Sequence, residues 1–165
     1  MWYVNGQKWS QWLQWLIHPF NHFNHLTILA ISLYHDLIID HYQYPRNFGE
    51  LKNPDATARE ANASCGDMVE FRIKVTSDKL QVTSIAWRGV GCAISAAAAS
   101  LLSERGKQIR QIRLIRQISQ KDMIDLLGGD ISHARIKCAT LPLVALQKAI
   151  GKLETNKLTN SQTNK

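Results

Sequence analysis

The chain has 165 residues, of which 45% are apolar and 20% charged, with nine Gly and four Pro. This composition fits one globular domain with a hydrophobic core and excludes collagen-like, low-complexity and wholly disordered chains. The net charge of +7 is concentrated in residues 105–165, which hold 12 basic and 4 acidic residues. No run of about 18 apolar residues predicts a membrane-spanning helix, and the N-terminus lacks the basic region of a secretory signal. We therefore expect a cytoplasmic protein, in a reducing compartment where cysteines act as ligands or nucleophiles more often than as disulfides.

Residues 1–32 differ from the rest of the chain, because they contain four of the five Trp and three of the six His. Their apolar residues recur at the spacing of one helix face up to Pro19: Trp9, Trp12, Leu13, Leu16, Ile17 and Phe20. We interpret this segment as an atypical apolar extension that docks on the domain or on a partner. Binding at a membrane interface, or a position upstream of the true translation start, are the alternatives.

Residues 33–153 are expected to form the main domain. A short amphipathic helix is predicted over 33–42, closed by Pro45 and Gly49, with four apolar residues on one side: Leu33, Leu37, Ile38 and Tyr42. A polar loop follows. Alternating residues then predict an antiparallel hairpin of strands 68–75 and 80–87, ended by Gly89 and Gly91.

Three helices are predicted after the hairpin. The first spans 92–105 and ends at Gly106, the second spans 121–127 between Ser119 and Gly128, and the third spans 139–153. Residues 154–165 are expected to be a polar, frayed tail. Arginines recur at every third position between the first two helices, at 110, 113 and 116. They indicate a solvated helix face or a docking surface for an acidic partner.

The three cysteines lie where the predicted elements begin or end. Cys65 precedes the first strand of the hairpin, Cys92 begins a helix, and Cys138 begins the last helix behind Arg135 and Lys137. The positive end of a helix and nearby cations stabilise a thiolate, which is the form that binds metal and attacks sulfur. Cys138 is therefore the predicted sulfur acceptor. The alternative is that the cysteines are only small buried hydrophobes.

Asp67 lies two residues from Cys65 across a glycine, so its carboxylate can face the same ion. Three thiolates and one carboxylate (Cys65, Cys92, Cys138 and Asp67) would complete a tetrahedral shell for Zn²⁺ or hold an iron–sulfur cluster. Because a carboxylate is the harder and weaker ligand, Asp67 is expected to be the one that opens during exchange. His133 is an alternative ligand, whereas His35 and His41 are expected to be surface or helix-end residues.

Four segments of the chain, in this order, resemble the iron–sulfur cluster assembly scaffolds of the IscU, SufU and NifU N-terminal family. They are Leu33-Tyr34 through Asp40-His41-Tyr42 with Pro45-Arg46-Asn47-Phe48-Gly49, then Cys65-Gly66-Asp67, then Gly89-Val90-Gly91-Cys92-Ala93-Ile94-Ser95, and Arg135-Ile136-Lys137-Cys138-Ala139-Thr140-Leu141. The resemblance covers residues 33–153. Residues 1–32 have no counterpart in it.

The resemblance implies an α+β fold, in which a small antiparallel sheet has helices packed on one side. It also implies that Cys65, Asp67, Cys92 and Cys138 converge at one exposed end. Such a protein takes persulfide sulfur from a cysteine desulfurase, binds zinc, iron or a [2Fe–2S] cluster, and serves acceptor apo-proteins. It is a scaffold or sulfur carrier and not an enzyme.

The chain combines features of two subfamilies. Lys137 stands before the third cysteine, as in SufU-like members, where IscU-like members have His. The Leu-Pro-Pro-Val-Lys segment that IscU-like scaffolds offer to a chaperone is missing. Against this, the 46 residues between Cys92 and Cys138 are too few for the full insertion of SufU-like chains. The residues around Cys138 favour the SufU-like group.

Two functions of other classes remain as rivals. A zinc-stabilised module that binds nucleic acid would use the basic residues 105–165, but no aromatic residue follows Trp87 to stack on bases. A cysteine hydrolase would need a His–Cys pair, for which His133 is the one candidate. We expect neither nucleic acid nor a membrane as a partner of the main domain.

Overall fold

The computed structural model describes residues 3–4, 7–8, 36–76, 80–129 and 131–162, with the side chains of the last range up to Thr155. The chain divides into two compact units, residues 1–35 and 36–165. In the first unit, β1 (Tyr3–Val4) pairs antiparallel with β2 (Gln7–Lys8). The predicted helical stripe at 9–20 lies outside the described residues. Within the described part of the chain, no helix has the length and hydropathy to cross a membrane.

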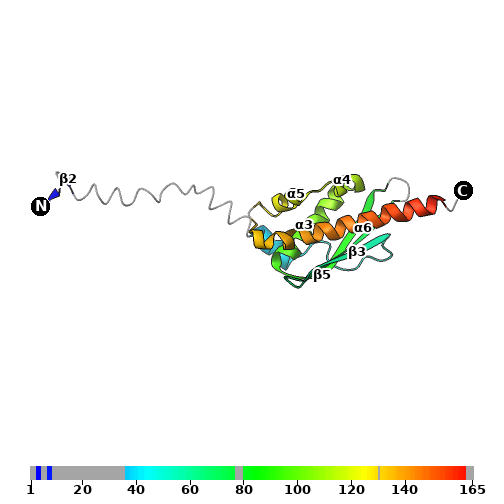
Figure 1. Cartoon of the computed structure of the whole chain (residues 1–165), viewed down its shortest axis with the longest axis horizontal. Helices are drawn as coiled ribbons and strands as arrows, with labels where there is room; N and C mark the ends of the chain where they lie inside the picture. The colour runs from blue at the N-terminus through cyan, green and yellow to red at the C-terminus, as the bar shows by residue number, and fades with distance from the viewer. Residues whose placement is uncertain (1–2, 5–6, 9–35, 77–79, 130, 163–165) are drawn as a thin grey trace. The chain divides into compact units, whose positions relative to one another are not determined.

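A three-stranded antiparallel sheet, in the order β3–β4–β5, forms the base of the second unit (Figure 1). Its strands are β3 (Ala56–Asn62), β4 (Asp67–Val75) and β5 (Val82–Val90). The predicted hairpin is confirmed as β4 and β5, with Phe71 opposite Trp87. The expectation of a polar loop before it is wrong over residues 56–62, because β3 pairs there with β4 and places Asn62 opposite Asp67.

The strand β5 runs three residues beyond the predicted end at Trp87. Gly89 continues the strand opposite Val69 instead of breaking it. A Cβ at this position would lie 2.2 Å from the Met68 carbonyl oxygen, so only glycine allows the two strands to approach this closely. The close approach brings the end of β5 beside the start of β4.

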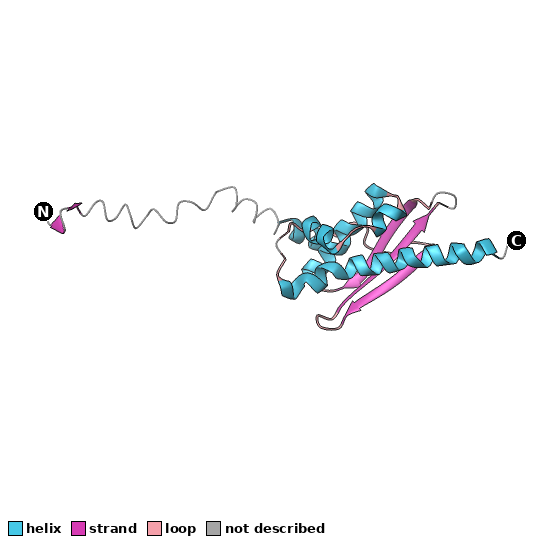
Figure 2. Cartoon of the chain, turned by 45° about the horizontal axis from the view of Figure 1, so that its top comes forward, coloured by secondary structure: helices cyan, strands magenta, loops and turns pink. Residues whose placement is uncertain are grey.

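The helices after the sheet are α3 (Ala93–Ile109), α4 (Ile112–Arg116), α5 (Gln120–Leu126), the 3₁₀ turn η2 (His133–Arg135) and α6 (Ile136–Gln162). Figure 2 shows α6 lying along the sheet, which confirms the α+β class with helices packed against the strands. α5 has the predicted cap at Ser119, whose hydroxyl accepts from the Asp122 N–H. The predicted helix end at Gly106 is wrong, since α3 continues to Ile109.

The long helix α6 differs from the prediction at both ends. It begins at Ile136, so Cys138 lies inside its first turn, and it continues to Gln162 through the segment expected to be frayed. Pro142 lies within α6 and is fully buried. The five residues predicted on its inner face are all buried: Leu141, Ala145, Leu146, Ala149 and Leu153.

The core lies between the sheet and the two long helices. The sheet contributes Phe71, Ile73 and Trp87, and α3 contributes Leu102 and a run of small residues at 96–99 of which three are fully buried. Small side chains allow a helix to approach its neighbours closely. α3 therefore packs against both β5 and α6, which fixes its N-terminus beside the end of β5.

Residues 36–43 are helical, as predicted for the described part of 33–42. Leu37 and Ile38 pack against the core, whereas Tyr42, predicted on the same side, is 51% exposed. The chain then follows β5, where the Trp87 N–H donates to the Asn47 carbonyl and the Gly49 N–H donates to the Trp87 carbonyl (3.0 and 2.9 Å). This segment extends the sheet at its β5 edge.

Candidate metal and sulfur site

Cys65 lies in the tight turn between β3 and β4. The pairing of Asn62 with Asp67 leaves residues 63–66 as the connection. The Cys65 N–H donates to the Asn62 carbonyl (3.2 Å), and Gly66 adopts φ +69°, a conformation that favours glycine. The turn leaves Cys65 exposed at one end of the sheet.

Asp67 begins β4 and is 2% exposed, which is unusual for a carboxylate. Its Oδ1 accepts from the backbone N–H of Cys92 (2.9 Å), and the Cys92 thiol donates to its Oδ2 (3.6 Å). A buried carboxylate is stabilised when such donors replace water. Asp67 therefore connects the β3–β4 turn to the start of α3.

The position of Cys92 depends on the glycine before it. Cys92 is the N-cap of α3, so its backbone turns from the end of β5 into the helix. A Cβ on Gly91 would lie 2.9 Å from Asp67 Oδ1 and would displace the carboxylate. The spacing Gly89-Val90-Gly91-Cys92 thus combines one glycine for the approach of two strands with one for the approach to Asp67.

Cys138 lies in the first turn of α6 and is fully buried. Its thiol donates to Cys65 Sγ (3.3 Å), and the Asn62 amide lies 4.0 Å from Cys138 Sγ. The sequence analysis missed Asn62 because it missed β3. The signal that could have found it is an Asn three residues before a cysteine turn, a residue type that often caps turns through its side chain. Here Asn62 Oδ1 accepts from the Ser64 N–H (3.2 Å).

The ligand atoms of Cys65, Asp67 and Cys138 all lie within 4.8 Å of one another. Cys92 is outside this compact group, but its thiol reaches Asp67 as described above. Ligand atoms around a tetrahedral Zn²⁺ lie about 3.5–3.8 Å apart, given bonds of about 2.0–2.3 Å. Soft thiolates with one carboxylate suit Zn²⁺ or iron, so these residues fit a metal ion or a cluster.

Burial raises the pKa of the Cys138 thiol to about 12, with further contributions from hydrogen bonds to Cys65 and Asp67 and from Cys92. The prediction that Cys138 is an accessible thiolate is therefore wrong for the metal-free site. The helix N-terminus does not overcome the loss of water and the neighbouring sulfur atoms. Cys65 is the exposed thiol of the three.

The cation predicted beside Cys138 is present. Arg135 is the last residue of η2, and charged thiolates at Cys92, Cys138 and Cys65 raise the pKa of its guanidinium above the ordinary value. Arg135 and Ala134 form one wall of an open cleft of about 590 Å³, opposite Cys65, Asp67 and Cys92. Lys137 and His133 are both exposed, and neither lines the cleft.

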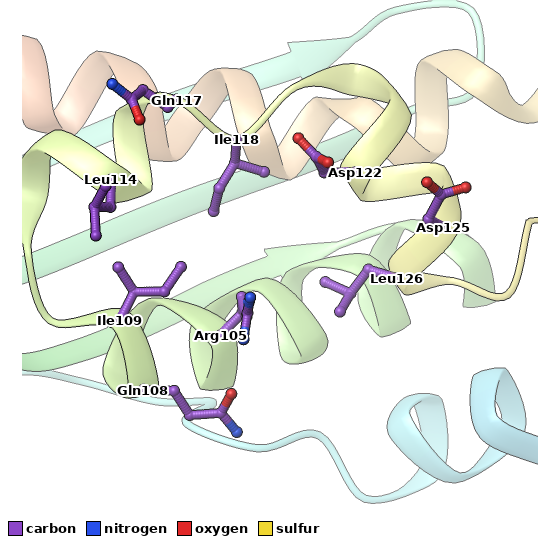
Figure 3. Close-up of a pocket in the computed structure, with 9 residues that line it drawn as sticks. All are labelled: Arg105, Gln108, Ile109, Leu114, Gln117, Ile118, Asp122, Asp125 and Leu126. Atoms are coloured by element: carbon purple, nitrogen blue, oxygen red, sulfur yellow. The ribbon is translucent and has the colours of Figure 1, made fainter.

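A second hollow, of about 490 Å³, lies between α3, α4 and α5 (Figure 3). Ile109, Leu114 and Ile118 form its apolar part, and Asp122 on its rim is occupied by the Ser119 cap. Its α3 residues begin 13 positions after Cys92, about 20 Å along the helix axis. This hollow is therefore separate from the cysteines.

The three arginines that recur at 110, 113 and 116 do not form one helical face, because α4 begins only at Ile112. Arg116 pairs with Glu154 on α6. Arg110 is the exposed residue that ends α3. The arginines thus support the solvated alternative, and their role in docking stays a prediction.

The fold and the site together define a small α+β domain that presents three cysteines and one aspartate at the end of a sheet. A family model described as "NifU-like N terminal domain" matches residues 33–160. The chain belongs to this family.

The curated relatives agree with this assignment. The chain is 36% identical over 141 residues to the "Zinc-dependent sulfurtransferase SufU" of Bacillus subtilis, covering 74% of this chain and 92% of that protein. It is 31% identical over 119 residues to the "Iron-sulfur cluster assembly scaffold protein IscU" of Aquifex aeolicus, covering 71% and 73%. It is 38% identical over 116 residues to the "Bifunctional protein NifU/MnmA" of Rubrobacter xylanophilus, but spans only 23% of that longer protein and 70% of its own length.

Solved structures show the same fold. A putative iron–sulfur cluster assembly scaffold protein for the SUF system from Fervidobacterium islandicum has a TM-score of 0.60 at 22% identity, covering 70% of this chain and 94% of that one. The N-terminal part of a NifU-like protein from Brucella abortus has a TM-score of 0.58 at 21% identity, covering 76% and 98%. The expected architecture is thereby confirmed.

Proposed function

We propose that this protein is an iron–sulfur cluster assembly scaffold or sulfur carrier that receives persulfide sulfur from a cysteine desulfurase. The observation that carries the proposal is the convergence of Cys65, Asp67 and Cys138 within 4.8 Å, with Cys92 bonded to Asp67. The names of the SufU and IscU relatives support both a sulfur-transfer and a scaffold role. The comparisons give no support to the alternative of a nucleic-acid-binding module.

The proposed ligands are Cys65, Asp67, Cys92 and Cys138, and they hold zinc, iron or a [2Fe–2S] cluster. When bound, the metal keeps the thiols deprotonated. The main domain, residues 33–153, carries this site, with 1–32 as an extension and 154–165 as a tail. The free thiols of all three cysteines support a reducing, cytoplasmic compartment.

In the proposed transfer, a thiolate of this chain attacks the terminal sulfur of the desulfurase persulfide. A new S–S bond forms on this chain, the S–S bond of the donor breaks, and the donor cysteine leaves as a thiolate. The sulfur keeps its oxidation state, so no further oxidant or reductant is needed. The product is a persulfide on this chain, ready for acceptor apo-proteins.

Cys138 is the proposed sulfur acceptor, which requires the start of α6 and η2 to move, because Cys138 is buried behind Cys65. Cys65 is a second candidate, favoured by its exposure at the mouth of the cleft. The two sulfur atoms lie 3.3 Å apart, so sulfur that arrives on one is close to the other.

The decisive experiment is metal and acid-labile sulfide analysis of protein purified without oxygen, together with its visible spectrum. We expect one metal site per chain, and a sharp loss of metal in each of Cys65→Ser, Cys92→Ser and Cys138→Ser. Ser64→Ala, in the same turn as Cys65, is the matched control and should retain the metal. Full metal content in all three cysteine variants would refute the proposed site.

A further inference from the structure

A groove of about 330 Å³ lies where the end of β5 meets the start of α3. Tyr42 and Phe48, from the segment before the sheet, form one side, and Val90 and Trp87 form the other. Ser95 of α3 lies among the lining residues. We call these five residues the aromatic groove.

Three residues of the aromatic groove expose large apolar surfaces. Tyr42 is 51% exposed, Phe48 is 53% exposed and Val90 is 64% exposed. Phe48 is nevertheless held in place, because its ring packs edge-on against Trp87 with the ring centroids 4.9 Å apart. Aromatic residues fixed on the surface in this way are typical anchors of protein interfaces.

Ser95 provides a second, independent observation. Its side chain is buried, at 1% exposure, and its hydroxyl has no hydrogen-bond partner among the residues that the structure describes. Buried hydroxyls are nearly always paired, because an unpaired one loses its bonds to water without replacement. A serine without a partner among apolar neighbours indicates a place where another molecule supplies the missing bond.

The aromatic groove is continuous with the sulfur cleft. Gly91 lines both, and Cys92 follows it directly. A protein that delivers sulfur to this cleft must cover the surface around it, because stable interfaces bury about 800 Å² on each partner. The apolar ground beside the cleft is then part of the contact.

We propose that the aromatic groove is the docking site of the cysteine desulfurase, into which the desulfurase inserts an apolar side chain. The backbone of the inserted segment supplies the hydrogen bond that Ser95 lacks. This inference rests on the proposed function, which names the desulfurase as the sulfur donor. It places the donor on the β5–α3 side of the cleft, opposite Arg135.

The test uses the full-length, metal-loaded chain and the cysteine desulfurase of the same organism, with the dissociation constant measured by calorimetry. Tyr42→Ala and Val90→Asp should each weaken binding about tenfold or more, with metal content and melting temperature close to those of the parent. Leu114→Ala is the matched control, because Leu114 is 47% exposed on α4, outside the groove. It should bind like the parent.

Ser95→Ala gives a signature that a purely structural role would not produce. Removal of an unpaired hydroxyl should raise the melting temperature of the free chain while weakening its binding to the desulfurase. A lower melting temperature with unchanged binding would show that the hydroxyl serves the free chain, and would overturn the role given to Ser95.

The outcomes separate this inference from the proposed function. If the parent chain binds the desulfurase and the two groove variants bind equally well, the docking site is wrong and the proposed function stands. If the parent chain does not bind at all, the sulfur donor itself is wrong. If Val90→Asp converts a dimer of this chain to a monomer without changing desulfurase binding, a second copy occupies the groove and the inference is overturned.

Discussion

The Asp67 carboxylate accepts a hydrogen bond from the backbone N–H of Cys92 at 2.9 Å, across 25 residues of sequence. One side chain thus joins the β3–β4 turn to the first residue of the α3 helix. Asp67 consequently has two roles, as a metal ligand in the proposed site and as a connection between two elements that carry cysteines.

Replacement of Asp67 separates these roles. Asp67→Ala leaves the Cys92 N–H without its acceptor and should cost about 1–3 kcal/mol of folding free energy. Asp67→Asn keeps an acceptor for that N–H but removes the charge. We expect both variants to slow sulfur or cluster transfer more than they reduce metal content, and only the alanine variant to melt at a clearly lower temperature. Transfer by Asp67→Asn at the parent rate would show that the charge is not needed.

The site of sulfur transfer can be located by mass spectrometry after brief incubation with the desulfurase and cysteine. The proposal expects added sulfur on the Cys138 peptide first. The pKa of about 12 for the buried thiol means that Cys138 becomes a nucleophile at neutral pH only after its surroundings change. In Cys65→Ser, Cys138 should still gain sulfur. Persulfide on Cys65 with Cys138 unmodified would assign the acceptor to the exposed thiol.

Stability should fall between pH 7 and pH 5 because of His41. Burial lowers the pKa of His41, and the Arg46 cation adds to the effect, against the opposing charges of Glu104 and Asp40. The folded state then binds fewer protons than the unfolded state, so stability is lost as pH falls through the ordinary value of about 6.5. His41→Gln should reduce this dependence of melting temperature on pH.

The exposed His133 provides the control for this measurement. His133→Gln should melt with the same pH dependence as the parent. If His41→Gln keeps the full pH dependence of the parent, another group is responsible for the acid sensitivity.

Two glycines should respond in opposite ways to alanine. Gly91→Ala places a Cβ 2.9 Å from Asp67 Oδ1, so it should destabilise the chain by about 1–3 kcal/mol and reduce its metal affinity. Gly151→Ala meets nothing within 4 Å in the middle of α6 and should stabilise the chain by about 0.5–1 kcal/mol. Denaturant titration of both variants measures these changes, and equal effects would contradict the close approach at Gly91.

The hairpin and the α5 cap were predictable because their signals are local. Alternation of apolar residues fixed the two faces of β4, and Ser119 with Asp122 forms the reciprocal cap that its sequence favours. β3 was not predictable by the same means. Its inward residues are Ala56 and Ala58, and alanine has little preference for strands. These positions are small because α6 packs against β3, which only the tertiary structure shows.

The error at Gly106 has a similar origin. A glycine after a helical pattern indicates an end, but a Cβ on Gly106 would lie 2.6 Å from the Ile85 side chain on β5. The glycine is needed for packing and not for a turn, so the helix continues. In the same way, a helix start with cations predicts an activated thiol at Cys138, whereas its burial depends on the β3–β4 turn that covers it.

Pro142 in α6 bears directly on how Cys138 can become reachable. Proline has no N–H, so the Cys138 carbonyl receives no helical hydrogen bond from the residue four positions later. The turn that carries the cysteine is attached to the remaining helix by one bond fewer than an ordinary turn. It can uncoil while the long part of α6, anchored by Leu146 and Ile150 in the core, stays folded. The buried thiol is thus mounted on the least secured turn of the most firmly anchored helix.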